Sequence, residues 1–390
     1  MMTIYKVNRF FISLFIAVSI IASGQVFAAS KIDSELGDNE VKIGKEAAVE
    51  IAKEYKFSDN AADLKRVRDI GNKIAAIANK KEISAVYGIS KITPFEFQFN
   101  IIEDKDINAF CVPGGLIYVY RGLLDFVESD DELAGVIAHE IVHASHHHMV
   151  FLVKKQASLQ NAMAIALLAT MFTGAASADV NNVLLGVQLY QIAKLNGYGM
   201  QAERDSDNGA ILYMRDTGYN PVGLLTFLER LARRPELIDY GIYRSHPIDA
   251  DRVNSAKSAI QAQGLPINRR ATTKAIKAEV KIENVDGVEI PSVAVQGKVI
   301  YRPAPTNGKS SLERANEIAD KINSALDTEI KLHELKLAPG LREVVVQNKV
   351  LLVVSDADAQ LMGMTPAQVA KGVAMAIRDI VWKQMVDTIH

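Results

Sequence analysis

The feature that most constrains this chain is a polar string inside an apolar stretch, His139-Glu140-Ile141-Val142-His143. Ser129, followed three residues later by Glu132, is a capping-box pattern that predicts a helix start just before this stretch. Residues four apart lie on one face of a helix, so both histidines can bind one metal ion. Burying these side chains without such a partner would cost free energy. The string therefore predicts a buried helix with a metal-dependent hydrolytic site, in which Glu140 is the general base.

A catalytic zinc site needs a third protein ligand beside the two histidines and keeps one position for water. The metzincin spacing is not met, because position 146 is not glycine and Met149 stands where the third histidine would be. An acidic segment about sixty residues downstream, Glu203-Arg204-Asp205-Ser206-Asp207, offers an alternative. Glu203 and Asp207 are again four apart, so one can bind the metal while the other supports a histidine ligand.

The first residues have the pattern of an export signal. Lys6 and Arg9 precede an apolar run from Phe10 to Ala22, and small residues follow around Ala28. We expect a signal peptide over residues 1–28 and a periplasmic mature protein. The alternative is an N-terminal membrane anchor, but the run is shorter than the roughly 20 apolar residues that a spanning helix needs.

Charge and cysteine content narrow the class of partner. The formal net charge is −2, and it becomes −4 when the two cations of the predicted signal peptide are removed. There is no basic patch, so we expect no nucleic acid partner. Cys111 is the only cysteine, which excludes an internal disulfide, and we interpret it as a small buried apolar residue.

Apolar spacing predicts the order of elements in the first two thirds of the chain. Two amphipathic helices are expected over residues 37–80, followed by strands at 95–101 and Leu116–Tyr120. Further helices are expected over about 150–172, 181–217 and 221–233, the last opened by Asn220 and Pro221. The apolar segment Asn161–Phe172 is too short to span a bilayer, so we expect a buried helix. A peripheral membrane contact or a lid is the alternative.

A change in composition near residues 264–275 predicts a second domain. Beyond it we expect strands around Asp286-Gly287, a helix that begins at Ser310, a hairpin at Gln347-Asn348-Lys349 and a last helix capped by Thr365. The predicted division is residues 1–28, 29–265 and 266–390. We expect the last to be an α/β module that binds a substrate or an envelope protein partner.

Several ordered strings in residues 37–255 resemble one known family. Asn108-Ala109-Phe110-Cys111-Val112-Pro113-Gly114-Gly115 is similar to a string of the HtpX-, BepA- and Oma-like zinc peptidases, which are related to the CAAX prenyl protease. Gly218-Tyr219-Asn220-Pro221 and Ser245-His246-Pro247 with Arg252 are similar to later strings of that family. The resemblance implies an α+β protein with a mainly helical, zincin-type (gluzincin) peptidase domain and a small β-sheet.

The resemblance also implies roles for individual residues. One zinc ion per chain would be bound by His139, His143 and Glu203, with Glu140 as general base. Asp207 matches an aspartate that acts either as a proton donor or as a hydrogen-bond support for a ligand, and we favour support. His246 matches a histidine that either caps the zinc or stabilises the oxyanion. The alternative for His246 is a plain helix cap before a helix that starts at Pro247.

Departures from the family pattern leave these ligands in place. Ser206 and Cys111 stand where alanine is usual, and Met200 stands where an arginine is common, which puts in doubt any salt bridge that the arginine makes. His146, His147 and His148 follow the motif helix, and only His148 matches a family position. We interpret the three as favourable charge at a helix C-terminus, with a second metal site as the alternative.

These observations predict a zinc-dependent metalloendopeptidase of the cell envelope. By resemblance, its substrates would be unfolded or misassembled envelope proteins, added as an extended strand beside Leu116–Tyr120 if that strand lies at the sheet edge. One alternative is a chaperone-like binding module whose zinc is capped by His246. Another is that residues 266–390 are an adhesive or scaffold domain and the protease only processes its own chain.

Overall fold

The computed structural model describes residues 36–158, 169, 198–234, 241–247, 249–285, 287–306, 308–327, 330–338 and 340–387. Contacts divide the chain into two compact units, Met1–Ile267 and Asn268–His390, and each is described by itself. The predicted signal peptide, nearly all of the segment 161–172 and the start of the helix predicted over 181–217 lie outside the described residues. Among the residues that are described, no helix has the length and apolar character to cross a bilayer.

The first unit combines helices with one small sheet, as the sequence predicts. It opens with a helix over residues 36–54 and α2 (Ala61–Ala78), which match the two predicted amphipathic helices. The sheet contains β1 (Gln98–Ile102), β2 (Ala109–Val112) and β3 (Leu116–Tyr120). The described helices that follow are α3 (Arg121–Phe126), α4 (Asp130–Ser145), α5 (His148–Ser158), α8 (Met200–Thr217), α9 (Val222–Ala232), α10 (Ile242–Ser245) and α11 (Ala250–Ala262).

The strand order β1-β3-β2 places β3 in the middle of the sheet. Strand β3 pairs in parallel with β1 and antiparallel with β2. The condition for substrate pairing beside Leu116–Tyr120, that this strand lies at the sheet edge, is therefore not met, because both of its sides are already hydrogen-bonded. Beside helix α4 the edge strand is β2, which the sequence analysis had treated only as part of a motif.

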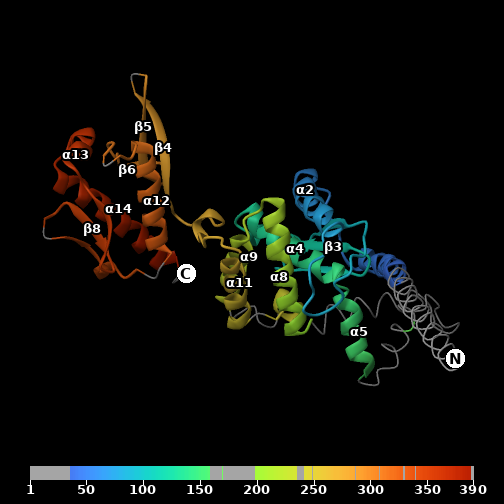
Figure 1. The fold of residues 1–390 in the computed structure, drawn as a ribbon. Coiled ribbons are helices and arrows are strands. Elements are labelled where there is room, and N and C mark those ends of the chain that lie inside the picture. Colours follow the sequence, from blue (N-terminus) through green and yellow to red (C-terminus); the bar gives the residue numbers. More distant parts are fainter. Residues whose placement is uncertain are drawn as a thin grey trace, which may run out of the picture. The chain divides into compact units, whose positions relative to one another are not determined.

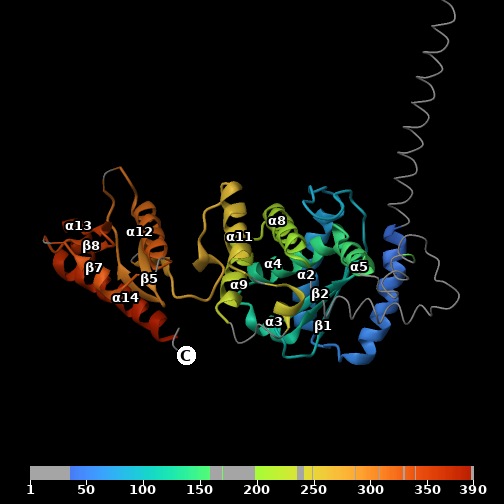
Figure 2. The same cartoon turned by 90° about the horizontal axis from the view of Figure 1, so that it is seen from below.

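Helix α4 is the centre of the first unit. Ser129 caps it by accepting a hydrogen bond from the backbone N–H of Glu132. The predicted capping box is only half formed, because the Glu132 carboxylate accepts from the Glu128 N–H and from Arg230 instead. Residues 132–144 of α4 are all buried, with α2, α8 and α9 packed around them (Figures 1 and 2).

Close packing of α4 against α8 depends on one glycine. A Cβ atom at Gly209 would lie 2.8 Å from a methyl carbon of Val142. The contact lets the two helix backbones approach closely at the level of the motif histidines. Because α4 and α8 carry the predicted metal ligands, this approach determines whether those ligands meet.

The second unit has two antiparallel sheets. One contains β4 (Ala278–Val285), β5 (Val288–Val295) and β6 (Lys298–Tyr301), and the other contains β7 (Leu335–Leu337), β8 (Glu343–Val346) and β9 (Lys349–Val353). Helix α12 (Ser311–Leu326) packs on β4 and β5 (Figure 1), and α13 (Asp356–Met362) and α14 (Pro366–Asp387) follow. The predicted cap at Ser310, the hairpin at Gln347-Asn348 and the cap at Thr365 are all present.

Candidate metal centre

Four predicted site residues converge although they come from three parts of the first unit. His139 and His143 lie on α4, Glu203 lies in the first turn of α8, and His246 follows α10. The two motif histidines face each other with 3.0 Å between their Nε2 atoms. Glu203 lies 3.4 Å from His139 Nε2 and 3.5 Å from His143 Nε2. One donor atom from each of the four residues lies within 4.8 Å of the others, and all four side chains are buried.

The donor set and its spacing fit a zinc ion. Imidazole nitrogen and carboxylate oxygen are common zinc ligands, with bonds of about 2.0–2.2 Å. In a tetrahedron with such bonds, neighbouring donor atoms are separated by about 3.4 Å. The two histidine Nε2 atoms are 3.0 Å apart, and the Glu203 carboxylate has one oxygen 3.4 Å from His139 Nε2 and the other 3.5 Å from His143 Nε2. These three residues would hold the ion.

Asp207 and Arg252 contact this cluster: Asp207 contacts His139, and Arg252 contacts Asp207 and Glu203. Asp207 Oδ1 lies 2.9 Å from His139 Nδ1, one helical turn after Glu203 on the same face of α8. Arg252, on α11, donates two hydrogen bonds to the Asp207 carboxylate, both 2.8 Å long, and its Nη1 lies 2.7 Å from Glu203 Oε2. The His139 Nδ1–H thus points at Asp207, which leaves Nε2 free to bind a metal.

The sequence analysis assigned no role to Arg252. The residue was part of a string that resembled the family, and that string was the only available signal. With only 2% of its surface exposed, its charge must be compensated inside the protein. It compensates the charges of both Glu203 and Asp207, which are the two carboxylates behind the histidines.

Electrostatics in the metal-free protein follow from burial and these contacts. Burial would raise the pKa of Glu203, but the charges of His246 and Arg252 hold it well below its usual range. Burial would lower the pKa of His139, but hydrogen bonds with Asp207 and Glu203 raise it to about 9. Burial lowers the pKa of His143 well below 6.5, so this ring is neutral at pH 7.

His246 lies between the candidate metal ligands and Glu140. Its Nδ1 is 3.1 Å from Glu203 Oε1 and 3.3 Å from His139 Nε2, while its Nε2 is 3.3 Å from Glu140 Oε1. The plain helix-cap interpretation of His246 is wrong, because α11 begins at Ala250 and is capped by the Asp249 side chain. Among the described residues, Glu140 Oε2 and His246 Nε2 have no hydrogen-bond partner although they are buried.

The three histidines after α4 are buried rather than exposed at a helix end. His146 Nδ1 lies 2.5 Å from Asp205 Oδ2, and His147 Nδ1 lies 2.5 Å from Glu40 Oε2. His148 Nδ1 lies 2.9 Å from Nδ1 of the candidate ligand His143. Each ring therefore has its own buried polar partner, which the helix-dipole interpretation did not anticipate.

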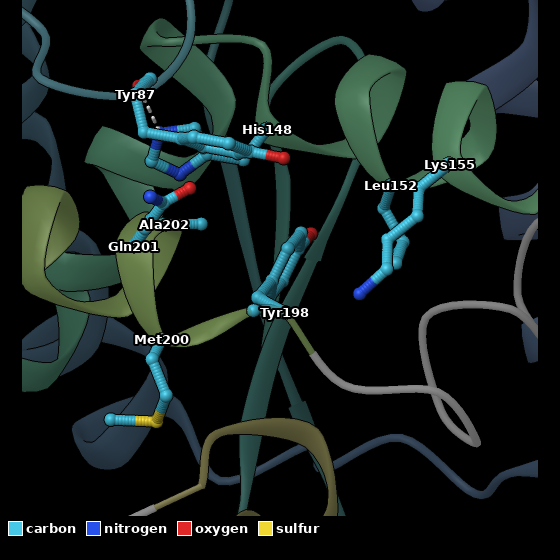
Figure 3. Close-up of a pocket in the computed structure, with 9 residues that line it drawn as sticks. Tyr87, His148, Leu152, Lys155, Tyr198, Met200, Gln201 and Ala202 are labelled. Carbon is cyan, nitrogen blue, oxygen red and sulfur yellow. Dashed lines mark hydrogen bonds between the residues drawn. The ribbon is translucent and has the colours of Figure 1, made fainter.

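A pocket of about 360 Å³ lies beside this network (Figure 3). Tyr87 and His148 line one side, and Leu152 and Lys155 reach it from α5. Tyr198, which precedes α8, stacks on the ring of His143 with 3.9 Å between the ring centroids. Its hydroxyl lies 3.8 Å from the sulfur of Cys111 on β2, a buried thiol as the sequence suggested.

Comparison with known proteins finds a family that matches part of each unit. Residues 67–260, about half of the chain, match Peptidase family M48. Residues 291–383 match a domain of unknown function, DUF8459. The first match contains α4, α8 and Arg252, and the second lies within the C-terminal unit.

Individual relatives are similar over parts of the chain. The "Beta-barrel assembly-enhancing protease" of Yersinia pestis is 26% identical over 199 residues, which are 49% of this chain and 38% of the relative. "Metalloprotease LoiP" of Escherichia coli (strain K12) is 28% identical, over 43% of this chain and 64% of the relative. "Mitochondrial metalloendopeptidase OMA1" of Schizosaccharomyces pombe is 28% identical, over 39% of this chain and 41% of the relative.

The matched region thus covers less than two thirds of each of these relatives. Residues 67–260, which match the family model, include the helix with both motif histidines and the helix with the glutamate that meets them. The family expected from the sequence motifs is confirmed: the chain belongs to Peptidase family M48.

Proposed function

We propose that this protein is a zinc-dependent endopeptidase with His139, His143 and Glu203 as metal ligands. The observation that supports it most is the meeting of these three side chains at separations expected for ligands of one ion. Bound there, zinc would supply the Lewis acidity that makes water nucleophilic near neutral pH and polarises a peptide carbonyl. Family membership and the names of the relatives support the same reaction class.

Glu140 is the proposed general base. It is buried next to His139, and one of its carboxylate oxygens has no hydrogen-bond partner among the described residues. A carboxylate in this position can take a proton from the attacking water and deliver it to the leaving amine. Asp207 and Arg252 touch ligands rather than reacting atoms, so they are positioning residues.

His246 is proposed to cap the site in its resting state. Its Nδ1 lies as close to His139 and Glu203 as a fourth ligand would, and its Nε2 approaches Glu140. A peptide that enters the site must then displace the His246 side chain. After displacement, the same imidazole is proposed to donate a hydrogen bond to the oxyanion.

The peptide substrate is proposed to add to β2 rather than β3. The Tyr120 N–H donates to the Asn108 carbonyl, whereas the Ile107 carbonyl accepts from Ile242 on the other side. Since hydrogen-bonding direction alternates along an antiparallel strand, the N–H and C=O groups of Ala109 and Cys111 point away from β3. Ala109 and Cys111 are buried in this structure, so an extended peptide would pair with these groups after the segments that cover them move aside. Such main-chain pairing reads few side chains. It therefore suits unfolded proteins.

We further propose a periplasmic location and unfolded or misassembled envelope proteins as substrates. The export signal expected over residues 1–28 and the name "Beta-barrel assembly-enhancing protease" of several relatives support this. The C-terminal unit is proposed to bind a substrate or an envelope partner. Both described clusters that could hold a metal ion lie in the first unit, so binding rather than metal chemistry is assigned to the second.

The test is cleavage of an unfolded protein such as reduced casein by the purified mature chain. We expect cleavage to depend on one zinc per chain, to stop with a chelator and to return with added zinc. Glu140→Gln should retain zinc and lose at least 100-fold in rate, because general base catalysis contributes about 10²–10⁴-fold. Unchanged cleavage by Glu140→Gln would overturn the peptidase assignment, and tight casein binding without cleavage by the wild type would favour the chaperone-like alternative.

A further inference from the structure

His148 contacts a metal ligand without being one. It is the first residue of α5 and is fully buried. Its Nδ1 lies 2.9 Å from His143 Nδ1. Its Nε2 lies 2.8 Å from the Tyr87 carbonyl oxygen (Figure 3). The same nitrogen lies 3.2 Å from Asp205 Oδ2. The imidazole thus joins the back of His143 to a loop and to α8.

The position of the His148 proton follows from its partners. A backbone carbonyl only accepts, and the Asp205 carboxylate already accepts from the Val86 and Tyr87 N–H groups. A neutral imidazole has one N–H, and only an N–H at Nε2 satisfies these acceptors. Nδ1 of His148 therefore presents a lone pair to His143. The Ser206 hydroxyl, 3.3 Å from the same nitrogen, can donate there as well.

The position of the proton on His143 follows in turn from its contact with His148. A lone pair on His148 Nδ1 requires an N–H at His143 Nδ1, because two facing lone pairs would repel each other. His143 Nε2 is then unprotonated, and this is the atom that faces His139 and Glu203. Tyr198 stacks on the ring and restricts its rotation. His143 is thus prepared to bind a metal.

We propose that His148 is a positioning residue that selects the metal-binding tautomer of His143, with the Tyr87 carbonyl and Asp205 fixing His148 in turn. His139 has the corresponding support from Asp207. The two ligands are therefore prepared by different means, one by a carboxylate and one by a second histidine. The inference rests on the proposed metal site and goes beyond its ligands.

The loop over residues 86–89 belongs to this support. In addition to the contacts of Val86 and Tyr87 with Asp205, the Ile89 N–H donates to the His146 carbonyl. Gly88 has a φ of +104°, and a Cβ there would lie 2.3 Å from the same carbonyl and 3.0 Å from the ring of His148. Only glycine permits the loop to approach the histidines this closely.

A second metal ion bound by His146, His148 and Asp205 is the competing interpretation. These side chains are buried and close enough to be grouped. However, the 2.5 Å between His146 Nδ1 and Asp205 Oδ2 is a hydrogen-bond distance, well under the separation of about 3.4 Å between ligands of a tetrahedral ion. His148 Nε2 also faces the Tyr87 carbonyl. The contacts favour a hydrogen-bonded support.

The test compares zinc affinity among variants of the full mature chain by chelator competition. Asn places an oxygen where His148 has Nδ1, so His148→Asn keeps the acceptor for His143. Gln places its amide where His148 has Nε2, so His148→Gln keeps the contact with Tyr87 and loses the acceptor. We expect His148→Asn to bind zinc within threefold of the wild type, and His148→Gln to bind 10–100-fold more weakly, as for other supports behind a ligand.

His147→Asn is the matched control. His147 is an equally buried neighbour that pairs with Glu40 and Thr93, and asparagine tolerates its φ of +57°. We expect this variant to lose stability and to keep wild-type zinc affinity. Equal loss of affinity in His148→Asn and His148→Gln, or no loss in either, would overturn the proposal.

A direct readout of the tautomer needs no variant at position 148. In ¹⁵N-histidine-labelled, metal-free protein, with His143 assigned by its absence in His143→Gln, we expect the proton on Nδ1. A proton on Nε2, or two zinc ions per chain falling to one in His146→Ala, would contradict the inference. A wild type that binds one zinc in this way yet cleaves nothing would instead contradict the proposed function alone.

Discussion

At the scale of single residues, the site is a buried set of charges arranged to cancel one another. Glu203 and Asp207 carry negative charge on α8, and Arg252 approaches both from α11. A buried charge is tolerated only with partners, and removal of one partner leaves the others uncompensated. Arg252 therefore keeps Glu203 ionised for the proposed metal ion and Asp207 ionised beside His139.

Substitution of Arg252 tests this balance. Arg252→Met removes the charge at similar volume and should lower the free energy of unfolding by about 3–5 kcal/mol, the usual cost of breaking a buried pair. Arg252→Lys keeps the charge but loses the paired hydrogen bonds to Asp207, so its loss should be smaller. Urea unfolding with a chelator present measures both, and equal stability of Arg252→Met and the wild type would contradict the account.

Residue types and spacing predicted much of the site. His139, Glu140 and His143 follow from helical periodicity, and Glu203 from the need for a third ligand together with a family resemblance. The support of His143 could not be predicted, because one of the partners that orient His148 is the backbone carbonyl of Tyr87. A carbonyl is present at every position and has no sequence signature. Arg252 and Tyr198 reach the site only through the packing of distant elements.

At the scale of elements, periodicity predicts where helices and strands lie along the chain better than it predicts which of them pair in space. Strand β3 was predicted with its observed bounds, yet its place in the middle of the sheet was not. Strand β1 begins three residues later than predicted, although Phe95 and Phe97 are buried as an alternating pattern requires. Alternation reports which side chains are buried, whereas strand order depends on long-range pairing.

The edge position of β2 leads to a prediction at this scale. Proline at Ala109 removes an N–H that points away from β3, so the sheet should keep its internal hydrogen bonds. Ala109→Pro should cleave unfolded protein at least tenfold more slowly, with zinc content unchanged, because a pairing N–H is lost and the ring obstructs the peptide. Phe110→Pro is the control, since its N–H points toward β3 and its loss should destabilise the fold. Wild-type cleavage by Ala109→Pro would exclude pairing at this edge.

At the scale of the whole molecule, the two units have separate cores and separate family matches. The second unit contains its own buried ion pair, in which Arg314 Nη1 lies 2.7 Å from Asp358 Oδ1 and Tyr301 donates to the same carboxylate. Burial would raise the pKa of Asp358, but the hydrogen bonds from Arg314 and Tyr301 hold it well below its usual value. Stability of this unit should therefore depend on pH.

The direction of this dependence follows from the lowered pKa. The ionised carboxylate stabilises the folded unit above the unfolded pKa of about 3.9, and this contribution is lost as pH falls below that value. Trp382, the only tryptophan, lies on α14 of this unit, so its fluorescence follows this unit alone during urea unfolding. We expect the urea concentration at the unfolding midpoint to decrease as the pH is lowered from 5 to 3. In Asp358→Asn this midpoint should depend less on pH. An equally steep loss of stability at low pH in Asp358→Asn would mean that other titratable groups cause the pH dependence.

The proposed chemistry depends on one metal ion held between α4 and α8. The most direct measurement is a crystal structure of the zinc-loaded mature chain with anomalous data at the zinc absorption edge. We predict one strong peak at about 2.0–2.2 Å from His139 Nε2, His143 Nε2 and a carboxylate oxygen of Glu203. No peak among these three side chains, or a peak only between His146, His148 and Asp205, would contradict it.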